Sequence, residues 1–279
     1  MWGVMGLFVR ALTSAGLTSF QISGVRSLLT AVLLAPVLLI VSPSLFKIKL
    51  KDLWCFLGTG ILSITFFNCC YFFAINEVTI SVAAILLYTA PIFVCVLSAI
   101  FFKERMTKSK IIALFICIIG CVLVTDVFFS EAKISTLGLL TGLGSGLGYA
   151  LYSIFSRAAI NRGYKTLTIL FYTFLFSSVS LFFIVDFSPV FKSVADGSFP
   201  WMYAILQAMV STVIPYLIYT VGLKYTENST ASIIASTEPV VATLAGLIVF
   251  SEIPSVPSAI GIILVLGAIA LLNIDRKKE

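Results

Sequence analysis

The sequence predicts an all-α integral membrane protein in which ten transmembrane helices form two inverted five-helix repeats. The 279 residues are 60% hydrophobic and 11% charged, whereas a soluble domain has about 25% charged residues. Apolar runs long enough to cross a bilayer follow one another with short polar breaks between them. The two halves of the chain also match one another. These three observations carry the prediction.

A transmembrane helix needs about 20 apolar residues, and such runs occupy nearly the whole chain. In order, they cover residues 1–15, 20–41, 53–75, 81–102, 110–129, 137–159, 167–185, 201–223, 229–250 and 257–274. The longest connecting loop, 186–199, leaves no room for a soluble domain. The first run is too short to span. We therefore expect helix one to lack its start, because either the true start codon lies upstream or the chain has been shortened.

The distribution of basic residues between the loops predicts the orientation. If the N-terminus is cytoplasmic, the inside stretches hold fourteen Lys and Arg residues and the outside stretches hold four. Both termini are therefore predicted on the cytoplasmic side of the cell membrane. The loops also account for the net charge of +6. The chain has no Lys/Arg-rich run with interleaved aromatic residues, so no nucleic-acid partner is expected.

The match between the halves appears when the sequence is shifted by 148 residues. Residues 71–124 then lie over 219–272 without a gap. The matched pairs include Tyr71 with Tyr219, Pro91 with Pro239 and Glu104 with Glu252. Chance similarity of apolar runs does not explain Pro, Glu and Tyr matching in one register. The repeats are predicted to cover 1–129 and 137–274. Five helices in each, an odd number, make the second repeat enter the membrane from the opposite side.

Two long stretches resemble a known family. TAPIFVCVLSAIFFKERMTKSKIIALFICIIGCVLV and TEPVVATLAGLIVFSEIPSVPSAIGIILVLGAIALL are similar to the two repeats of the EamA-type family in the drug/metabolite transporter superfamily. The opening MWG and Arg26 in helix two fit as well. The resemblance covers the whole chain and implies a ten-helix carrier of the cell membrane that exports amino acids or related metabolites. It also implies a central cavity near a two-fold axis. One departure is that Ala90 stands where the second repeat has Glu238.

Paired prolines point to the place of the cavity. Pro91 and Pro239 are each about the eleventh residue of a predicted helix, near the membrane midplane. A proline frees a backbone carbonyl one turn earlier, and broken helices at matching positions mark carrier sites. Both prolines are therefore expected to line a substrate cavity. The alternative is a packing kink whose carbonyl is capped by a hydroxyl of Thr89, Ser236 or Thr237.

Glu238 is the only acidic residue deep in any predicted segment. Insertion scales place a central carboxylate at about 2.5–3.5 kcal/mol against insertion, so it should face the bundle interior or water. It either binds a substrate ammonium group or a proton, or it holds helix nine to its neighbours through a hydrogen bond.

Other polar and aromatic side chains complete the predicted lining. They are Asn68, Tyr71, Tyr88, Tyr149, Gln207, Ser211, Tyr216 and Tyr219. An amide in hydrocarbon needs partners, whereas a tyrosine is more often a core or interface residue. Near the start of each half a shift of 147 residues places Trp2 over Tyr149. Arg26 is expected to snorkel to the headgroups, unless it attracts an anionic group.

Glycines recur in the sixth segment, GLLTGLGSGLG. Gly138, Gly142 and Gly146 are spaced by four residues, as are Gly144 and Gly148. Small residues at this spacing let helices approach closely. This packing is expected within the monomer or in a homodimer.

The pattern as a whole favours a secondary transporter of a small-molecule substrate in a lipid bilayer, working by alternating access and with proton coupling open. The chain has no histidine, and its six cysteines lie in apolar runs without a CxxC pair. No metal, cofactor or enzyme activity is therefore expected. A passive metabolite facilitator and a non-transport structural or regulatory membrane protein are the alternatives.

Overall fold

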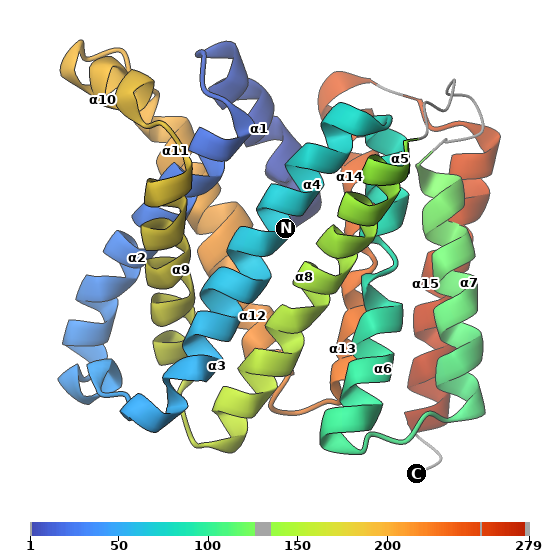
Figure 1. The fold of residues 1–279 in the computed structure, drawn as a ribbon. Helices are drawn as coiled ribbons and strands as arrows, with labels where there is room; N and C mark the ends of the chain where they lie inside the picture. Colours follow the sequence, from blue (N-terminus) through green and yellow to red (C-terminus); the bar gives the residue numbers. More distant parts are fainter. Residues whose placement is uncertain (1, 126–134, 252, 277–279) are drawn as a thin grey trace.

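The computed structural model describes residues 2–125, 135–251 and 253–276, and in these residues every regular element is a helix (Figure 1). Within these described residues, seven helical stretches are long and apolar enough to cross a membrane. They are Ser19–Val41, Leu50–Glu77, Ile80–Phe102, Thr136–Asn161, Thr166–Ile184, Trp201–Gly222 and Asn228–Val249. Large apolar side chains such as Ile40 and Phe183, 85% and 82% exposed, cover the outside of the bundle. That surface suits a lipid surrounding.

The first half of the chain begins with η1 (Trp2–Val4), α1 (Met5–Ser14) and α2 (Ser19–Val41). After the short turns η2 (Pro43–Phe46) and η3 (Leu50–Asp52), one span is formed by α3 (Leu53–Leu57), η4 (Gly58–Thr65) and α4 (Phe66–Glu77). The next span consists of α5 (Ile80–Leu87) and α6 (Ala90–Phe102), and α7 (Lys108–Val124) follows. The end of the predicted segment 110–129 lies outside the described residues.

The second half begins with the long α8 (Thr136–Asn161) and α9 (Thr166–Ile184). The short α10 (Ser188–Ala195) precedes a span made of α11 (Trp201–Ala208), η6 (Met209–Val213) and α12 (Ile214–Gly222). The last elements are α13 (Asn228–Ala235), α14 (Glu238–Phe250) and α15 (Val256–Arg276).

The loops lie on two opposite faces. Those that follow α2, α6, α8 and α12 lie at the lower edge of Figure 1 with the C-terminal end of α15. The loop 186–199 lies at the upper edge and contains α10, which the sequence analysis did not predict. This helix is short and has Pro189 in its first turn, and the Asp186 carboxylate accepts a 2.9 Å hydrogen bond from the backbone N–H of Ser188.

Two spans are broken in the middle, as predicted at Pro91 and Pro239. α5 ends at Leu87 and α6 begins at Ala90, while α13 ends at Ala235 and α14 begins at Glu238. All four boundaries of one span differ from those of the other by 148 residues. The residues just after α6 and α14, Lys103 and Ser251, also share a left-handed backbone with φ of 55° and 56°. In Figure 1 the α5–α6 span runs downward and the α13–α14 span runs upward.

Two other spans contain π-helical turns, η4 and η6, where the sequence analysis expected regular helices. A threonine hydroxyl near the end of each turn donates to the carbonyl five residues earlier: Thr65 to Gly60 at 3.1 Å, and Thr212 to Gln207 at 3.4 Å. Such turns often occur at functional sites. η4 also packs tightly on α9, because a Cβ added to Gly60 would lie 2.7 Å from the Thr173 carbonyl oxygen.

The glycines of α8 let two neighbours approach on different faces. A Cβ added to Gly142 or Gly146 would lie 2.3 Å or 2.8 Å from atoms of Leu86 or Thr89, next to the α5–α6 break. A Cβ on Gly148 would meet the backbone of Phe67 in α4 at 2.9 Å. The predicted close packing is confirmed within the chain.

Candidate functional site

The two helix breaks are capped by matching hydroxyl groups. Thr89 Oγ1 donates to the Leu86 carbonyl at 2.6 Å, and Thr237 Oγ1 donates to the Ile234 carbonyl at 2.9 Å. Ser236 Oγ adds a bond to the Ser232 carbonyl at 3.2 Å. These are the capping groups expected of a kink. The carbonyls that the prolines free belong to Leu87 and Ala235, one residue later, so the hydroxyls stabilise the end of each first half-helix instead of capping the freed carbonyls.

The breaks also face each other across a small void. Its volume is about 10 Å³, and its lining is Leu87, Tyr88, Ala90, Pro91, Tyr149, Ser232, Ala235, Ser236 and Glu238. Four predicted site residues therefore meet here, namely Tyr88, Pro91, Tyr149 and Glu238. Glu238 occupies the first position of α14, at the positive end of the helix, where a carboxylate is favoured.

A second void of about 10 Å³ adjoins the first through Tyr149. It is lined by Trp2, Ser63, Ile64, Phe67, Tyr149, Tyr152, Tyr216 and Tyr219. The Trp2 ring stands edge-on to Tyr149, Tyr216 and Tyr219 with ring centroids 6.2, 5.1 and 5.6 Å apart. Trp2 reaches this place because η1 packs against α14, and a Cβ on Gly3 would lie 2.7 Å from the Glu238 carbonyl oxygen.

Five predicted lining residues border neither void: Asn68, Tyr71, Gln207, Ser211 and Pro239. Asn68 instead joins α2 to α4, because its amide donates to the Ile64 carbonyl at 2.6 Å and accepts from Ser23 Oγ at 3.1 Å. Tyr71 stacks on Phe67 with ring centroids 5.9 Å apart. Gln207 and Ser211 are buried in the span that contains η6, and Pro239 is buried in the first turn of α14.

Arg26 does not snorkel, so that prediction is wrong. Arg26 is only 4% exposed, and its Nη1 donates to Met5 Sδ at 3.0 Å. It lies on the face of α2 that carries Ser23, Ser27 and Thr30, all buried against neighbouring helices. Sequence position near a helix end cannot tell which face a side chain occupies. A buried charge in a membrane is costly, which makes Arg26 a candidate functional residue.

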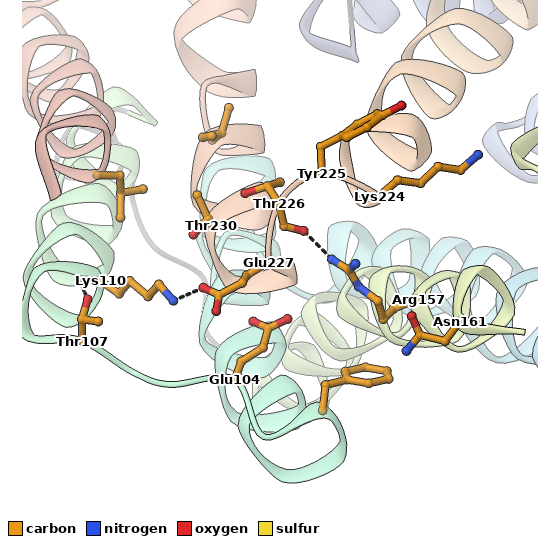
Figure 2. Close-up of a pocket in the computed structure, with 13 residues that line it drawn as sticks. Glu104, Thr107, Lys110, Arg157, Asn161, Lys224, Tyr225, Thr226, Glu227 and Thr230 are labelled. Atoms are coloured by element: carbon orange, nitrogen blue, oxygen red, sulfur yellow. Dashed lines mark hydrogen bonds and ion pairs between the residues drawn. The ribbon is translucent and has the colours of Figure 1, made fainter. Parts of the chain in front are cut away.

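A larger cavity opens at the lower face of Figure 1, between the ends of α6, α7, α8 and α13. Its volume is about 500 Å³, and we call it the vestibule (Figure 2). Lys110 forms an ion pair with Glu227, and Arg157 donates to the Thr226 carbonyl and to Asn228 Oδ1. This cavity was not predicted from the sequence, because its residues come from helix ends far apart in the chain.

Glu104 connects the vestibule to the α13–α14 span. Its carboxylate accepts hydrogen bonds from the backbone N–H groups of Asn228 and Ser229 at 2.8 and 3.1 Å and from Ser229 Oγ at 2.9 Å. The end of one broken span therefore caps the start of the other. The repeat match of Glu104 was the only sequence signal for this role, and Glu252, its partner in that match, lies outside the described residues.

A comparison with protein families decides what kind of protein carries this site. A model of the EamA-like transporter family matches residues 1–126 and 136–274. The chain belongs to this family. The resemblance found in the sequence is thus confirmed, and the EamA-like transporter is a multi-pass membrane protein that moves a small-molecule substrate.

Relatives and a solved structure agree with the family. The EamA-like transporter is 30% identical over 201 residues to an uncharacterized transporter of Archaeoglobus fulgidus, covering 72% of this chain and 70% of the relative. It is 23% identical to the uncharacterized transporter YetK of Bacillus subtilis, covering 93% and 79%. A crystal structure of another protein superposes with a TM-score of 0.81 at 15% identity, covering 99% of this chain and 94% of that one, which shows a shared fold.

Proposed function

We propose that this transporter is a secondary carrier that exports amino acids or related small metabolites by alternating access. Its substrate site would be the centre lined by Trp2, Tyr149, the two helix breaks and Glu238. The observation that carries the proposal is the meeting of both broken spans at one void, since broken helices at matching positions form the sites of many secondary transporters.

We further propose ten transmembrane helices in two inverted repeats, covering residues 1–129 and 137–274. Three pairs related by the 148-residue shift line the central void together: Leu87 with Ala235, Tyr88 with Ser236, and Ala90 with Glu238. Three further observations support a two-fold axis through the void. The two broken spans run in opposite directions, their boundaries match under the 148-residue shift, and Trp2 contacts Tyr149.

The centre is closed and the vestibule is open, and this difference supports alternating access. Each central void has about 10 Å³, which is at most the space of one water molecule. The vestibule has about 500 Å³, which suits a small metabolite. A substrate would therefore enter from the vestibule side and reach Glu238 only after α13 moves away from α6 or α8.

Orientation follows from charge. The loops at the vestibule face carry Lys47, Lys103, Lys165 and Lys224, and basic loops face the cytoplasm. We place the vestibule and the C-terminal end of α15 in the cytoplasm of a cell whose plasma membrane holds the carrier, whereas Trp2, the first described residue, lies beside the central void. Export then begins with loading from the vestibule.

Counterflow in proteoliposomes tests the proposal. Labelled amino acids and related metabolites would be offered to the wild type and to Glu238→Gln, with and without an imposed pH gradient. We expect uptake that responds to the gradient only when Glu238 is present, because its carboxylate is the group in the centre that can exchange a proton. Glu77→Gln is the matched control, since Glu77 lies at the upper end of α4 and accepts a hydrogen bond from Ser135.

Each other result has a distinct meaning. Uptake that ignores both the gradient and Glu238→Gln identifies a passive facilitator with a structural Glu238. No counterflow of any compound by the folded wild type contradicts a carrier of amino acids and related metabolites. Loss of folding in Glu238→Gln alone assigns that carboxylate to helix packing.

A further inference from the structure

Arg26 is a buried cation whose hydrogen-bonding capacity is largely unused. Its Nε has no hydrogen-bond partner among the described residues, and Nη1 donates only to the weak acceptor Met5 Sδ. No described aspartate or glutamate forms an ion pair with it. Arginine does not lose its proton in proteins, so the positive charge stays in the bundle without a counter-charge from the residues that the structure describes.

Three more buried donors on adjoining elements also lack partners. They are Thr30 Oγ1, Ser211 Oγ and Trp2 Nε1, each without a hydrogen-bond partner in the described part of the chain. Thr30 lies one turn after Arg26 on α2, Ser211 is in η6, which contacts α2, and Trp2 is in η1, which contacts η6. Buried polar groups are normally paired, so four unpaired donors on contacting elements indicate a missing acceptor.

These donors border the proposed substrate site. Tyr216 lies close enough to Arg26 for an electrostatic interaction, and its ring contacts the Trp2 ring at 5.1 Å. Trp2 in turn contacts Tyr149, which lines the same void as Glu238. A series of contacting aromatic rings therefore leads from the unpaired cation to the acidic residue at the helix break.

We propose that Arg26 binds the carboxylate of the transported substrate once the centre has opened. This assignment rests on the proposed carrier function and narrows the substrate to molecules that carry a carboxylate, amino acids among them. A guanidinium offers two parallel N–H groups that match a carboxylate, and hydroxyls such as those of Thr30 and Ser211 can satisfy its remaining lone pairs. The rings of Tyr216 and Trp2, on the side of Arg26 that faces the central voids, would contact the rest of the substrate.

The test compares a substrate with an analogue that lacks the negative charge. Counterflow would be measured for wild type, Arg26→Gln, Arg26→Lys and the control Arg105→Gln, with unlabelled L-phenylalanine or L-phenylalaninamide as competitors of the labelled amino acid taken up. Arg105 undergoes the same chemical change in an exposed loop. We expect Arg26→Gln to weaken competition by L-phenylalanine by at least about tenfold and to leave that by L-phenylalaninamide unchanged. Arg26→Lys should fall between, and Arg105→Gln should match wild type.

A second measurement separates failure of this inference from failure of the carrier proposal. Thermal unfolding of the purified protein would be followed with benzoate, benzamide and chloride, which requires no transport. Stabilisation by benzoate but not by benzamide, present in wild type and lost in Arg26→Gln, supports a carboxylate site even if no amino acid is carried.

Three results would overturn the inference. Equal loss of competition by L-phenylalanine and its amide would make Arg26 structural, and unchanged competition by both would exclude it from the site. Stabilisation by chloride as strong as that by benzoate, together with L-phenylalanine competition that does not depend on Arg26, would assign the site to a free anion.

Discussion

Glu104 joins two half-helices that are far apart in the sequence. It follows α6 in the chain, yet its carboxylate accepts three hydrogen bonds from the first residues of α13. A carboxylate at a helix N-terminus satisfies orphan N–H groups and interacts favourably with the helix dipole. Since α13 also borders the vestibule, Glu104 stabilises the arrangement in which α13 lies against α6.

Replacing Glu104 with alanine should therefore destabilise the protein. We expect a loss of about 1–3 kcal/mol, because two backbone N–H groups and one hydroxyl lose a charged acceptor. Thermal unfolding in detergent would measure it. Glu227→Ala removes a carboxylate from the same vestibule, but the Glu227 side chain is half-exposed in its ion pair with Lys110, so the pair should contribute only about 0–1 kcal/mol. Equal destabilisation by both variants would contradict the capping role.

The packing of α7 against α15 depends on the absence of side chains at two glycines. A Cβ on Gly261 would lie 2.6 Å from the Gly120 carbonyl oxygen and 2.8 Å from the Val124 backbone nitrogen. Both contacts are with backbone, so neither can move away as a flexible side chain would. The two helices must separate to admit even one methyl group.

Gly261→Ala should consequently lower stability by about 1–3 kcal/mol, as overpacking does. The same helix offers its own control, because a Cβ on Gly267 would meet no atom within 4 Å. Gly267→Ala should be neutral or stabilising by up to about 1 kcal/mol, since alanine favours the helix over glycine. Thermal unfolding of both variants compares them directly, and an unchanged midpoint for Gly261→Ala would refute the close contact.

Prediction from sequence succeeded where one residue dictates local geometry. Pro91 and Pro239 lack the N–H that continues a helix, and both breaks were predicted from them and from their match across the repeat, although Pro36 lies inside the unbroken α2. The π-helical turns could not be predicted in this way, because Gly60 and Thr65 mark the turn only through their contacts with α9, which the local sequence does not reveal. The burial of Arg26 depends on the rotation of α2, and the sequence signal for it was the polar face that Arg26 shares with Ser27 and Thr30. The vestibule was missed because Glu104 and Asn228 meet only in three dimensions.

Basic residues gather in the loops of the vestibule face, whereas the longest loop, 186–199, lies on the opposite face of the molecule. Lys47 and Lys192 are exposed and lie on the two different faces, after α2 and within α10. Our proposed orientation therefore assigns Lys47 to the cytoplasm and Lys192 to the outside.

Thiol labelling tests this orientation. In a background where the partly exposed Cys69 and Cys70 are replaced by serine, a membrane-impermeant maleimide applied to intact cells should label Lys192→Cys and spare Lys47→Cys. Permeabilised cells should label both, which controls for reactivity. The reverse pattern in intact cells would place the vestibule outside and make the proposed direction of transport untenable.

The two capped breaks have a mechanical consequence. The Thr89 and Thr237 hydroxyls donate to carbonyls three residues earlier in their own spans, so these hydrogen bonds can stay intact when a span bends at its break. The second break has one more partner, because Cys121 Sγ in α7 donates to the Ser236 carbonyl at 3.8 Å. Bending at the first break therefore changes the angle between two half-helices at little backbone cost, whereas bending at the second also strains a weak bond to α7. The side chains and the substrate between the two oppositely directed spans would then supply the free energy that decides which one bends.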